Sequence, residues 1–419
     1  SDLFLPHREI DGYGINMNTV KTLKKEKTDL IITCDCGISN IQEINTAQES
    51  DMQVIITDHH TTPKDLPPAN AIIHPLVQGE KYPDKGLSGG GVAFKLLQAL
   101  LKEHKKSNDF LIDGQSHESF EKWSLDLAAI SIIGDMMPLV GEARTITRYG
   151  LTVLNKTKNL GLRKLMQIAG IFDENNKPKR KEIDSETVAF QIVPRINAAG
   201  RMEHANVALA LLVSEDEKDA QKLAKKLNQN NLDRQKLTEQ IVNQARKQIK
   251  ETKQEENPVL FVFEKKWNTG ILGLIAGKLK DEYYRPVIVM GENEGEITGS
   301  GRSIYEFNLI EALQQINGVF SKFGGHPQAC GFSLVNPEKI EEMKNKLTLL
   351  AIEKLKGMEL TPLINIDAEV NLEEINWELF DILEKFSPFG QKNEPPKYCA
   401  GIFTSITSLS NPICLFVIK

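Results

Sequence analysis

The chain has 419 residues, 40% of them hydrophobic and 26% charged, which is typical of a globular protein with two or three domains. No apolar run approaches the roughly 18–20 residues of a membrane-spanning helix, and the first residues lack the basic and apolar regions of a secretory signal. The formal net charge of −6 disfavours a nucleic-acid coat protein, although a local cluster of lysine and arginine would still suffice to bind phosphates.

The five cysteines favour a reducing compartment, the cytoplasm, because they are odd in number and scattered along the chain. Cys34-Asp35-Cys36 contains a close pair, but no second pair follows at the spacing of a zinc site. We therefore expect neither a disulfide framework nor structural zinc.

The first third of the chain alternates strand-like and helical stretches. β-Prone apolar runs occur at residues 30–33, 54–57 and 71–73. Apolar residues at helical spacing occur between the first two runs, at 92–101 after a glycine turn at 88–91, and at 125–133 before Gly134-Asp135. Strands that alternate with helices predict βαβ units and a parallel sheet.

The middle of the chain is predicted to be helical. Residues 216–250 indicate one long helix, or two helices broken near Asn230-Asn231, and their dense charges are typical of a solvated face. A second α/β domain, with strands at 259–263 and 286–290, is expected to end near residue 355. The β-prone runs that would then begin a small β domain are 363–366 and 401–406.

Acidic residues follow two neighbouring strands of the expected sheet. The first run leads to Asp35, and the second leads directly to Asp58-His59-His60. The carboxyl ends of neighbouring parallel strands converge where ligands usually bind, so we expect these side chains to share one crevice. Asp135 follows a helix that looks buried, where an isolated charge needs a partner.

Carboxylates combined with imidazole suit Mn²⁺ or Mg²⁺, and Mn²⁺ matches the histidine better. A bridging carboxylate can hold two such ions about 3.5–4 Å apart, and the pair can activate water and neutralise charge in phosphoryl hydrolysis. Three consecutive Asp-His-His residues at a strand end therefore indicate a metal site. Asp135, taken alone, could equally be a solvent-exposed helix end.

Several segments together resemble the DHH phosphoesterases, and among them the RecJ exonucleases. Asp58-His59-His60 matches the motif that names the DHH family, and residues 33–37 resemble its preceding aspartate motif. Residues 194–202 are close to a RecJ signature, and residues 388–395 resemble the start of the RecJ OB domain. The other matching segments, in the family's order, are 87–95, 134–139, 299–303 and 323–326.

The resemblance implies an α/β fold in four parts. A parallel-sheet DHH domain (1–155) would be joined by long helices (156–255) to a smaller α/β DHH-associated domain (256–356), followed by the start of an OB-like β-barrel domain (357–419). It also implies metal-dependent hydrolysis of single-stranded DNA from 5′ to 3′, in DNA repair and recombination.

The resemblance further assigns roles to the acidic and histidine residues. Two Mn²⁺ or Mg²⁺ ions would be bound by Asp35, His59 and Asp135, with Asp35 as the bridge. His60 would face the scissile phosphate, and Asp58 would bind metal or orient a histidine. An earlier acidic motif of the family has no counterpart, so we expect the chain to begin after that motif, its metal site to be incomplete and its activity to be reduced.

The candidate substrate contacts of the second half lie in two glycine-rich segments. The glycines of residues 299–303 would let backbone N–H groups approach a phosphate, with Arg302 binding it bidentately beside Ser303, although such segments are commonly just turns. Gly325 would leave room for a strand beside His326, which could bond a phosphate or stack on a base.

Three further arginines are candidate phosphate contacts. Arg195 and Arg201 flank the centre of the RecJ signature, with a helix-capping ion pair as the alternative for either. Arg8 could meet a 5′ phosphate, because its segment resembles RecJ. Trp267 is interpreted as core, and Asn268 stands where RecJ proteins often carry histidine.

Two alternative functions stay open. A DHH phosphodiesterase for cyclic dinucleotides or short RNA shares the Asp-His-His and Gly-Gly-His motifs but usually lacks the segments at 194–202 and 388–396. A catalytically silent DNA-binding scaffold on the same fold would bind no metal. By resemblance, the expected partners are single-stranded DNA, a single-strand-binding protein and a helicase, with no membrane.

Overall fold

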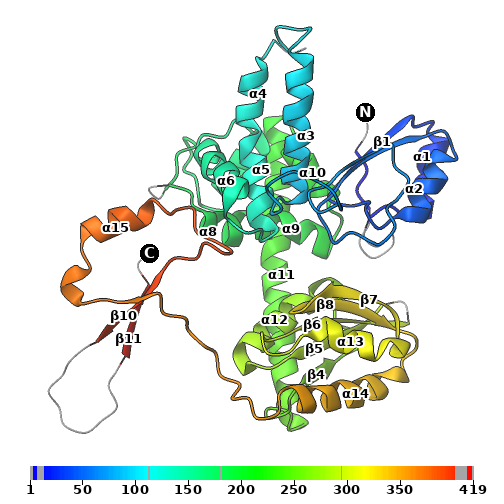
Figure 1. The fold of residues 1–419 in the computed structure, drawn as a ribbon, viewed down its shortest axis with the longest axis vertical. Coiled ribbons are helices and arrows are strands. Elements are labelled where there is room, and N and C mark those ends of the chain that lie inside the picture. The colour runs from blue at the N-terminus through cyan, green and yellow to red at the C-terminus, as the bar shows by residue number, and fades with distance from the viewer. Residues whose placement is uncertain are drawn as a thin grey trace. The chain divides into compact units, whose positions relative to one another are not determined.

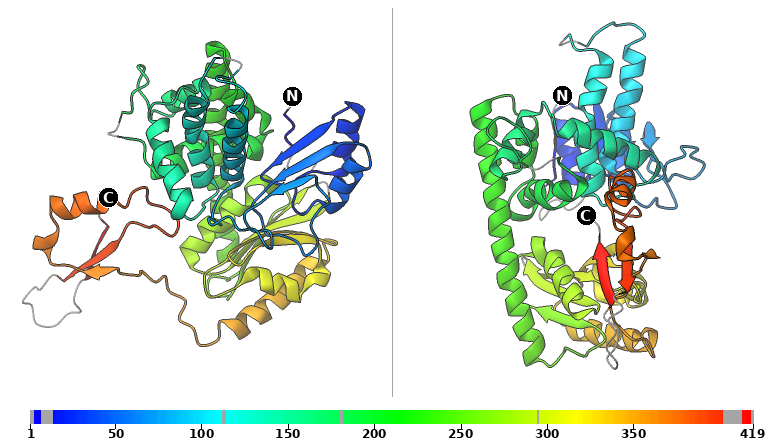
Figure 2. Two further views of the ribbon diagram at one scale, coloured as in Figure 1. Left: turned by 45° about the horizontal axis from the view of Figure 1, so that its top comes forward. Right: turned by 90° about the vertical axis from the view of Figure 1, so that its left-hand side faces the viewer.

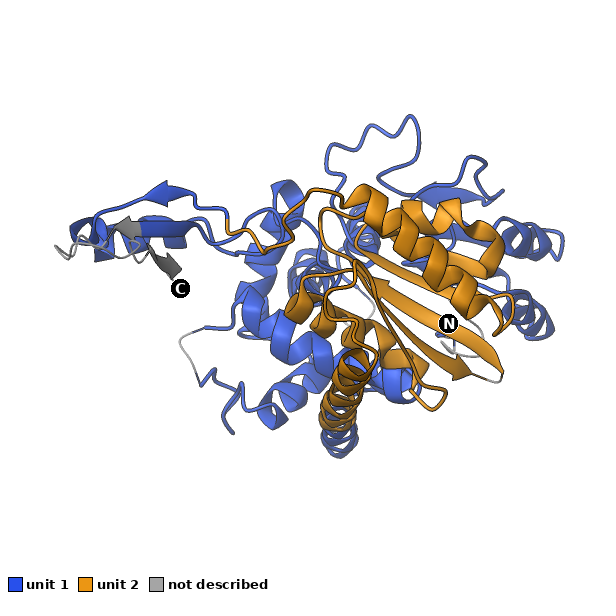
Figure 3. Cartoon of the chain, turned by 90° about the horizontal axis from the view of Figure 1, so that it is seen from below, with its two compact units in different colours: residues 1–229, 365–419 blue, residues 230–364 orange. Residues whose placement is uncertain are grey.

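The computed structural model describes residues 3–6, 14–111, 114–179, 182–293, 295–401 and 413–417. The chain divides into two compact units, residues 1–229 with 365–419, and residues 230–364 (Figure 3). Within the described residues, no helix is long and apolar enough to cross a membrane. The expected division into four parts stays a prediction.

A parallel sheet organises the start of the first unit, as the sequence predicts. Its strands β1 (Leu30–Cys34), β2 (Gln53–Thr57) and β3 (Ala71–Ile73) pair in the order β1-β2-β3. Helices α1 (Met17–Lys25) and α2 (Ile41–Gln48) pack on it through apolar side chains. The buried members of this core are Val20, Ile44, Ala47, Met52, Val54 and Ile56.

Helix α3 (Gly89–His104) begins three residues earlier than predicted. Ser88 caps it by accepting a hydrogen bond from the N–H of Gly91 at 3.1 Å, so residues 89–91 are the first turn of the helix and the expectation of a separate glycine turn was wrong. Helix α5 (Leu125–Gly134) leads to Asp135 as predicted.

The other helical elements between α3 and α11 belong to the same unit as α5 (Figure 1). They are α4 (His117–Trp123), α6 (Gly141–Leu154), α7 (Leu160–Ile168), α8 (Ser185–Thr187), the π-helical turn η1 (Val188–Ile192), α9 (Val193–Met202) and α10 (Asn206–Leu212). The RecJ-like signature at 194–202 is therefore a helix.

Helix α11 (Glu217–Glu251) is one unbroken helix, so the alternative of two helices was wrong (Figure 2). Its first turns contribute Ala220, Ala224 and Leu227 to a core of the first unit. Its later turns contribute Ile241 and Ala245 to a core of the second unit. Asn231 is buried, and the helix continues through the asparagine pair.

A five-stranded mixed sheet forms the second unit, with strand order β4-β5-β6-β8-β7. β4 and β5 are parallel, and the other pairs are antiparallel. The strands are β4 (Leu260–Phe263), β5 (Val287–Asn293), β6 (Glu296–Arg302), β7 (Phe320–His326) and β8 (Ala329–Leu334). The helical elements are η2 (Thr269–Ile271), α12 (Leu272–Tyr283), α13 (Leu309–Gln315), η3 (Asn317–Val319) and α14 (Lys339–Lys354).

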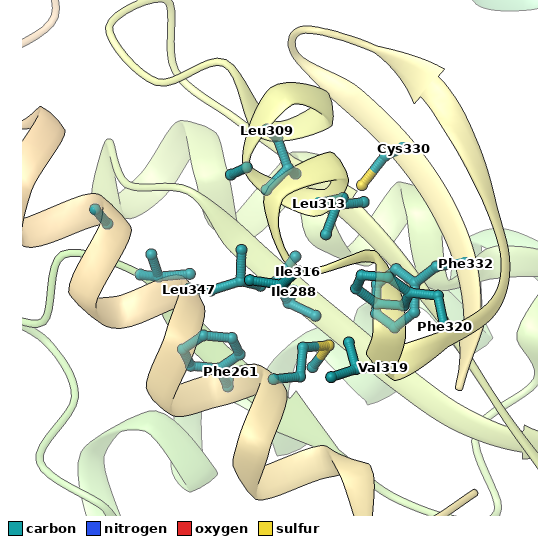
Figure 4. Close-up of a cluster of buried hydrophobic side chains, with 14 of the residues drawn as sticks. Phe261, Ile288, Leu309, Leu313, Ile316, Val319, Phe320, Cys330, Phe332 and Leu347 are labelled. Atoms are coloured by element: carbon teal, nitrogen blue, oxygen red, sulfur yellow. The ribbon is translucent and has the colours of Figure 1, made fainter. Parts of the chain in front are cut away.

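One core of this unit gathers apolar side chains from the sheet and from α13 and α14 (Figure 4). Phe261 and Ile288 come from β4 and β5, Leu313 from α13 and Leu347 from α14. Burying these side chains is the main source of stability for the unit, at about 1.5–3 kcal/mol for each fully buried large residue.

The C-terminal part of the first unit contains a three-stranded arrangement in the order β11-β10-β9. Its elements are β9 (Ala368–Glu369), η4 (Leu372–Glu374), α15 (Trp377–Glu384), β10 (Lys397–Gly401) and β11 (Ile413–Val417). The predicted strand at 363–366 was wrong, because this segment is irregular and Leu363 is 81% exposed. Of the predicted run 401–406, Gly401 ends β10 and the rest lies outside the described residues.

Candidate metal site

The three strands of the parallel sheet end in polar residues. Asp35 follows β1, Asp58 follows β2 and His74 follows β3. Asp35 adopts a left-handed backbone conformation with φ of +64°, and its N–H donates to the carbonyl of Thr57 at 3.0 Å. That bond fixes the end of β1 against the end of β2. His74 was not singled out from the sequence, although its position directly after a β-prone run is the same signal that identified Asp58.

The ring of His59 lies between two carboxylates from different elements. Its Nε2 atom is 3.0 Å from Oδ1 of Asp35 and 3.2 Å from Oδ2 of Asp135. The His59 side chain is 10% exposed, whereas the two carboxylates are about half exposed, at 49% and 42%. The structure therefore brings together the three predicted metal ligands at the ends of β1, β2 and α5.

The spacing of these atoms fits a six-coordinate divalent ion. Ligand atoms held at about 2.1 Å in an octahedron lie about 3.0 Å from their neighbours. The separations around His59 Nε2, 3.0 and 3.2 Å, match that value. The donor set of carboxylate oxygen and imidazole nitrogen also suits Mn²⁺ and Mg²⁺. A ligand atom of His60 lies within 4.8 Å of those of Asp35 and His59, so His60 belongs to the same cluster.

Asp58 is 1% exposed and holds the turn that carries both histidines. Its Oδ2 accepts from the N–H of Ile38 at 3.0 Å, and its Oδ1 accepts from the N–H groups of His59 and His60 and from Nδ1 of His60 at 2.7 Å. Burial alone would raise the pKa of Asp58, but the bonds from His60 and from the three backbone groups lower it to about 2. Since both oxygens are engaged, the geometry favours an orienting role for Asp58 over a ligand role.

His60 is held by both its ring and its backbone. The hydrogen bond from Nδ1 to Asp58 is the main cause that raises the pKa of His60. Nε2 is then the ring nitrogen through which His60 can act at the site. The carbonyl of His60 accepts from Nε2 of His74 at 2.9 Å, and Nδ1 of His74 accepts from the N–H of Leu76 at 3.0 Å, which makes His74 a neutral imidazole. Burial accordingly lowers the pKa of His74.

The two cysteines beside Asp35 have raised thiol pKa values. Burial, followed by the charges of Asp58 and Asp35, raises the pKa of Cys36 to about 12. Burial also raises the pKa of Cys34.

The glycine segment around Arg302 is a strand and not the turn that the sequence suggested. A Cβ atom at Gly299 would overlap the ring of Phe332 on β8, so packing explains this glycine. Nη1 of Arg302 donates to Ser300 Oγ at 3.1 Å and to the carbonyl of Gly301 at 2.8 Å. Burial lowers the pKa of Arg302.

The other candidates of the second unit differ in their surroundings. Ser303 is 3% exposed, and its hydroxyl donates to the carbonyl of Phe307 at 2.6 Å. Gly325, with φ of +143°, and the exposed His326 end the edge strand β7. Trp267 is 5% exposed and donates to Gln244 at 2.8 Å, which confirms it as core. Asn268 caps η2 by accepting from the N–H of Gly270.

The remaining candidates are three arginines. Arg195 is half-buried in α9 and donates to the carbonyl of Gln191 at 2.6 Å and to Asn228 Oδ1 at 2.9 Å, a helix-to-helix contact. Burial lowers the pKa of Arg195. Arg201 lies in the last turn of the same helix. Arg8 lies outside the described residues.

Comparisons with known proteins match three domains in the order of the chain. The DHH family, N-terminal domain matches residues 2–132, the DHHA1 domain matches residues 256–353, and the RecJ OB domain matches residues 366–405. The mixed α/β architecture, with a parallel sheet before the second α/β domain and an OB match at the end, confirms the predicted fold class.

Curated relatives and solved structures extend this likeness over nearly the whole chain. The single-stranded-DNA-specific exonuclease RecJ of Bacillus subtilis is 37% identical over 94% of the chain, and that of Salmonella typhimurium is 30% identical over 94%. The crystal structure of RecJ in complex with Mn²⁺ from Thermus thermophilus has a TM-score of 0.78 and 29% identity over 92% of the chain.

The chain covers these relatives unequally. It spans 47% of the Bacillus protein and 54% of the Thermus structure, so it is about half their length. It covers 68% of the Salmonella protein at 30% identity. With three domains matched in order and this likeness over most of its length, the chain belongs to the RecJ family of DHH proteins.

Proposed function

We propose that the chain is the catalytic core of a metal-dependent exonuclease that hydrolyses single-stranded DNA from its 5′ end, in DNA repair and recombination. The convergence of Asp35, His59 and Asp135 at the ends of β1, β2 and α5 is the observation that carries this proposal. The relatives named as single-stranded-DNA-specific exonucleases support the substrate class. The likeness over most of the chain favours this function over a phosphodiesterase for cyclic dinucleotides or short RNA.

Asp35, His59 and Asp135 would hold Mn²⁺ or Mg²⁺, with Asp35 bridging two ions. The bound ions would supply an activated water and would neutralise charge on the phosphate. Asp58 would keep Nδ1 of His60 protonated and its ring in place, so that Nε2 of His60 bonds a phosphate oxygen or moves a proton. The residues that we propose to contact the strand are Arg302, Ser303, Gly325, His326, Arg195, Arg201 and Arg8.

The partners and compartment of the protein are also proposals. By family resemblance, a single-strand-binding protein would present the DNA and a helicase would unwind it. The scattered cysteines support action in the cytoplasm. Co-purification of the intact chain with each purified partner, with and without single-stranded DNA, would test the two associations separately.

The metal site is tested by titrating the chain with Mn²⁺ in a calorimeter. Asp35→Asn should raise the Kd for Mn²⁺ by more than about 100-fold, since even residues outside the ligand set typically cost 10–100-fold. Asp51→Asn is the matched control, because Asp51 is exposed and has the same left-handed backbone, with φ of +62°. A wild-type chain that binds no Mn²⁺ would contradict the proposal and favour the silent scaffold.

The substrate is tested with a long single strand labelled at its 5′ end, a duplex of the same sequence and a cyclic dinucleotide. The proposal predicts Mn²⁺-dependent release of labelled mononucleotide from the single strand, and loss of this activity in Asp35→Asn. Hydrolysis of the dinucleotide with the long strand intact would instead favour the phosphodiesterase.

A further inference from the structure

The loop between α5 and α6 contains the proposed metal ligand Asp135. A segment that is distant in sequence, residues 385–393, contacts this loop. Asp135 caps the C-terminus of α5, and Met136 then turns the backbone away with φ of +54°. Four residues after Asp135, the N–H of Leu139 donates to the carbonyl of Gln391 at 2.8 Å. The loop is therefore tied to a segment more than 250 residues away in sequence.

Arg144, in the first turn of α6, binds the same C-terminal segment at a second point. Its guanidinium donates to the carbonyls of Lys385 at 3.0 Å, Phe386 at 2.9 Å and Ser387 at 3.0 Å. These carbonyls lie just beyond the last turn of α15, where the helix dipole favours a cation. Hydrogen bonds from a charged donor are about twice as strong as neutral ones, so this contact anchors α15 to α6.

Residues 385–393 form a turn that is closed by hydrogen bonds between its own residues. Nδ2 of Asn393 donates to the carbonyls of Phe386 and Pro388, both at 2.9 Å, and Gly390 and Asn393 exchange backbone hydrogen bonds. Ser185, at the start of α8, donates to the carbonyl of Phe389 at 2.5 Å. Figure 1 shows the chain after α15 returning to α8. The turn is thus held from several sides before it meets the Asp135 loop.

The turn also packs directly on the Asp135 loop. Leu139 is 2% exposed and belongs to the core that contains Ala143 and Ile146 of α6. A Cβ atom at Gly390 would lie 2.7 Å from Cδ1 of Leu139, so the glycine lets the turn lie in close contact with this side chain. A displacement of the turn would therefore be passed to Leu139 and along the short loop to Asp135.

We propose that residues 385–393 brace the α5–α6 loop and that Arg144 is a positioning residue for the metal ligand Asp135. The brace holds Oδ2 of Asp135 at 3.2 Å from Nε2 of His59, so that both can face one ion. This inference rests on the proposed metal site. It links the RecJ OB region to the acidic cluster through side chains that do not themselves bind metal.

The inference is tested by measuring the Kd for Mn²⁺ and the metal-free melting temperature of four variants of the whole chain. Arg144→Ala removes the anchor, and Arg144→Lys keeps its charge. Asn393→Ala loosens the turn without changing α6. Arg148→Ala is the matched control, because Arg148 is an exposed arginine one turn further along the same helix.

Arg144→Ala and Asn393→Ala should each raise the Kd for Mn²⁺ about tenfold, the lower end of the range for residues that support a metal ligand. Arg144→Lys should restore part of the affinity, and Arg148→Ala should bind as the wild type does. A purely structural role would lower the melting temperature and leave the Kd unchanged, and that result would overturn the inference. If Arg144→Ala does not fold, the Kd of Asn393→Ala for Mn²⁺ tests the inference alone. If the wild type does not bind Mn²⁺, the proposed metal site itself is refuted.

Discussion

Gly299 lies in the middle of β6, where the ring of Phe332 occupies the space that a side chain would need. From the sequence, the glycines around Arg302 predicted a flexible phosphate-binding turn. The structure explains Gly299 by a close approach between neighbouring strands. A glycine in a strand can mark either feature, and the sequence does not contain the position of the ring across the sheet that would decide between them.

Gly299→Ala should destabilise the second unit by about 1–3 kcal/mol, because the added methyl group forces Phe332 to move in a well-packed core. Gly277→Ala is the control, since Gly277 lies in α12 and a Cβ atom there would have no neighbour within 4 Å. This change should stabilise the unit by up to about 1 kcal/mol, the difference in helix propensity. Urea unfolding of both variants would measure the two effects, and equal midpoints would contradict the packing argument.

At the residue scale, the sequence predicted a site residue only where the residues next to it in the chain indicated its role. Asp35 and Asp58 were found because each follows an apolar β-prone run. His74 follows a third such run but was not predicted, because no acidic residue stands next to it in the sequence. Arg144 could not be found, since its function depends on carbonyl groups of residues 385–387, which are distant in sequence.

At the scale of elements, the first turn of α3 packs against Asp35, the residue that follows β1. Ser88 caps α3, and a Cβ atom at Gly89 would overlap the side chain of Asp35. The glycine therefore allows the first turn of the helix to lie directly against a candidate metal ligand. The sequence predicted this helix but not its start, because three glycines suggest a turn until the cap of Ser88 is seen.

Gly89→Ala should displace Asp35 and raise the Kd for Mn²⁺ by at least about tenfold, as changes around metal ligands do. Gly91→Ala lies in the same turn, and the atoms nearest to its Cβ atom would be Cβ and Cδ2 of Leu87 and Oγ of Ser88, at 3.3, 3.4 and 3.5 Å. Its affinity should stay close to that of the wild type. The electron paramagnetic resonance signal of free Mn²⁺ would report both values. Equal affinities in the two variants would show that Asp35 is not held by this contact.

The elements that the sequence predicted well are those whose hydrophobic pattern alone determines them. The three parallel strands are short β-branched runs, and their predicted ends differ from the structure by at most one residue. Helix α11 stays continuous through Asn230 and Asn231, whose side chains are both buried, and the sequence alone did not reveal that burial. The run at 363–366 failed for the opposite reason, since its apolar side chains are exposed and its backbone pairs with no strand among the described residues.

At the scale of the whole molecule, the two units have separate hydrophobic cores that share one helix. The core of Ala220, Ala224 and Leu227 belongs to the first unit, and that of Ile241 and Ala245 belongs to the second. Side chains from the first and from the later turns of α11 thus contribute to two different cores, which can lose their packing independently. The candidate metal ligands belong to the first unit alone.

Heating the chain should therefore produce two unfolding transitions, of which Mn²⁺ raises only one. Binding to the folded first unit stabilises it by about 2.7 kcal/mol when the free ion is at 100 times its Kd. Gly299→Ala should lower the other transition and leave the metal-dependent one in place. Scanning calorimetry with and without Mn²⁺ would measure both, and hydrogen exchange would assign each transition to its unit. A single transition that shifts as a whole with Mn²⁺ would mean that α11 couples the two cores into one cooperative unit.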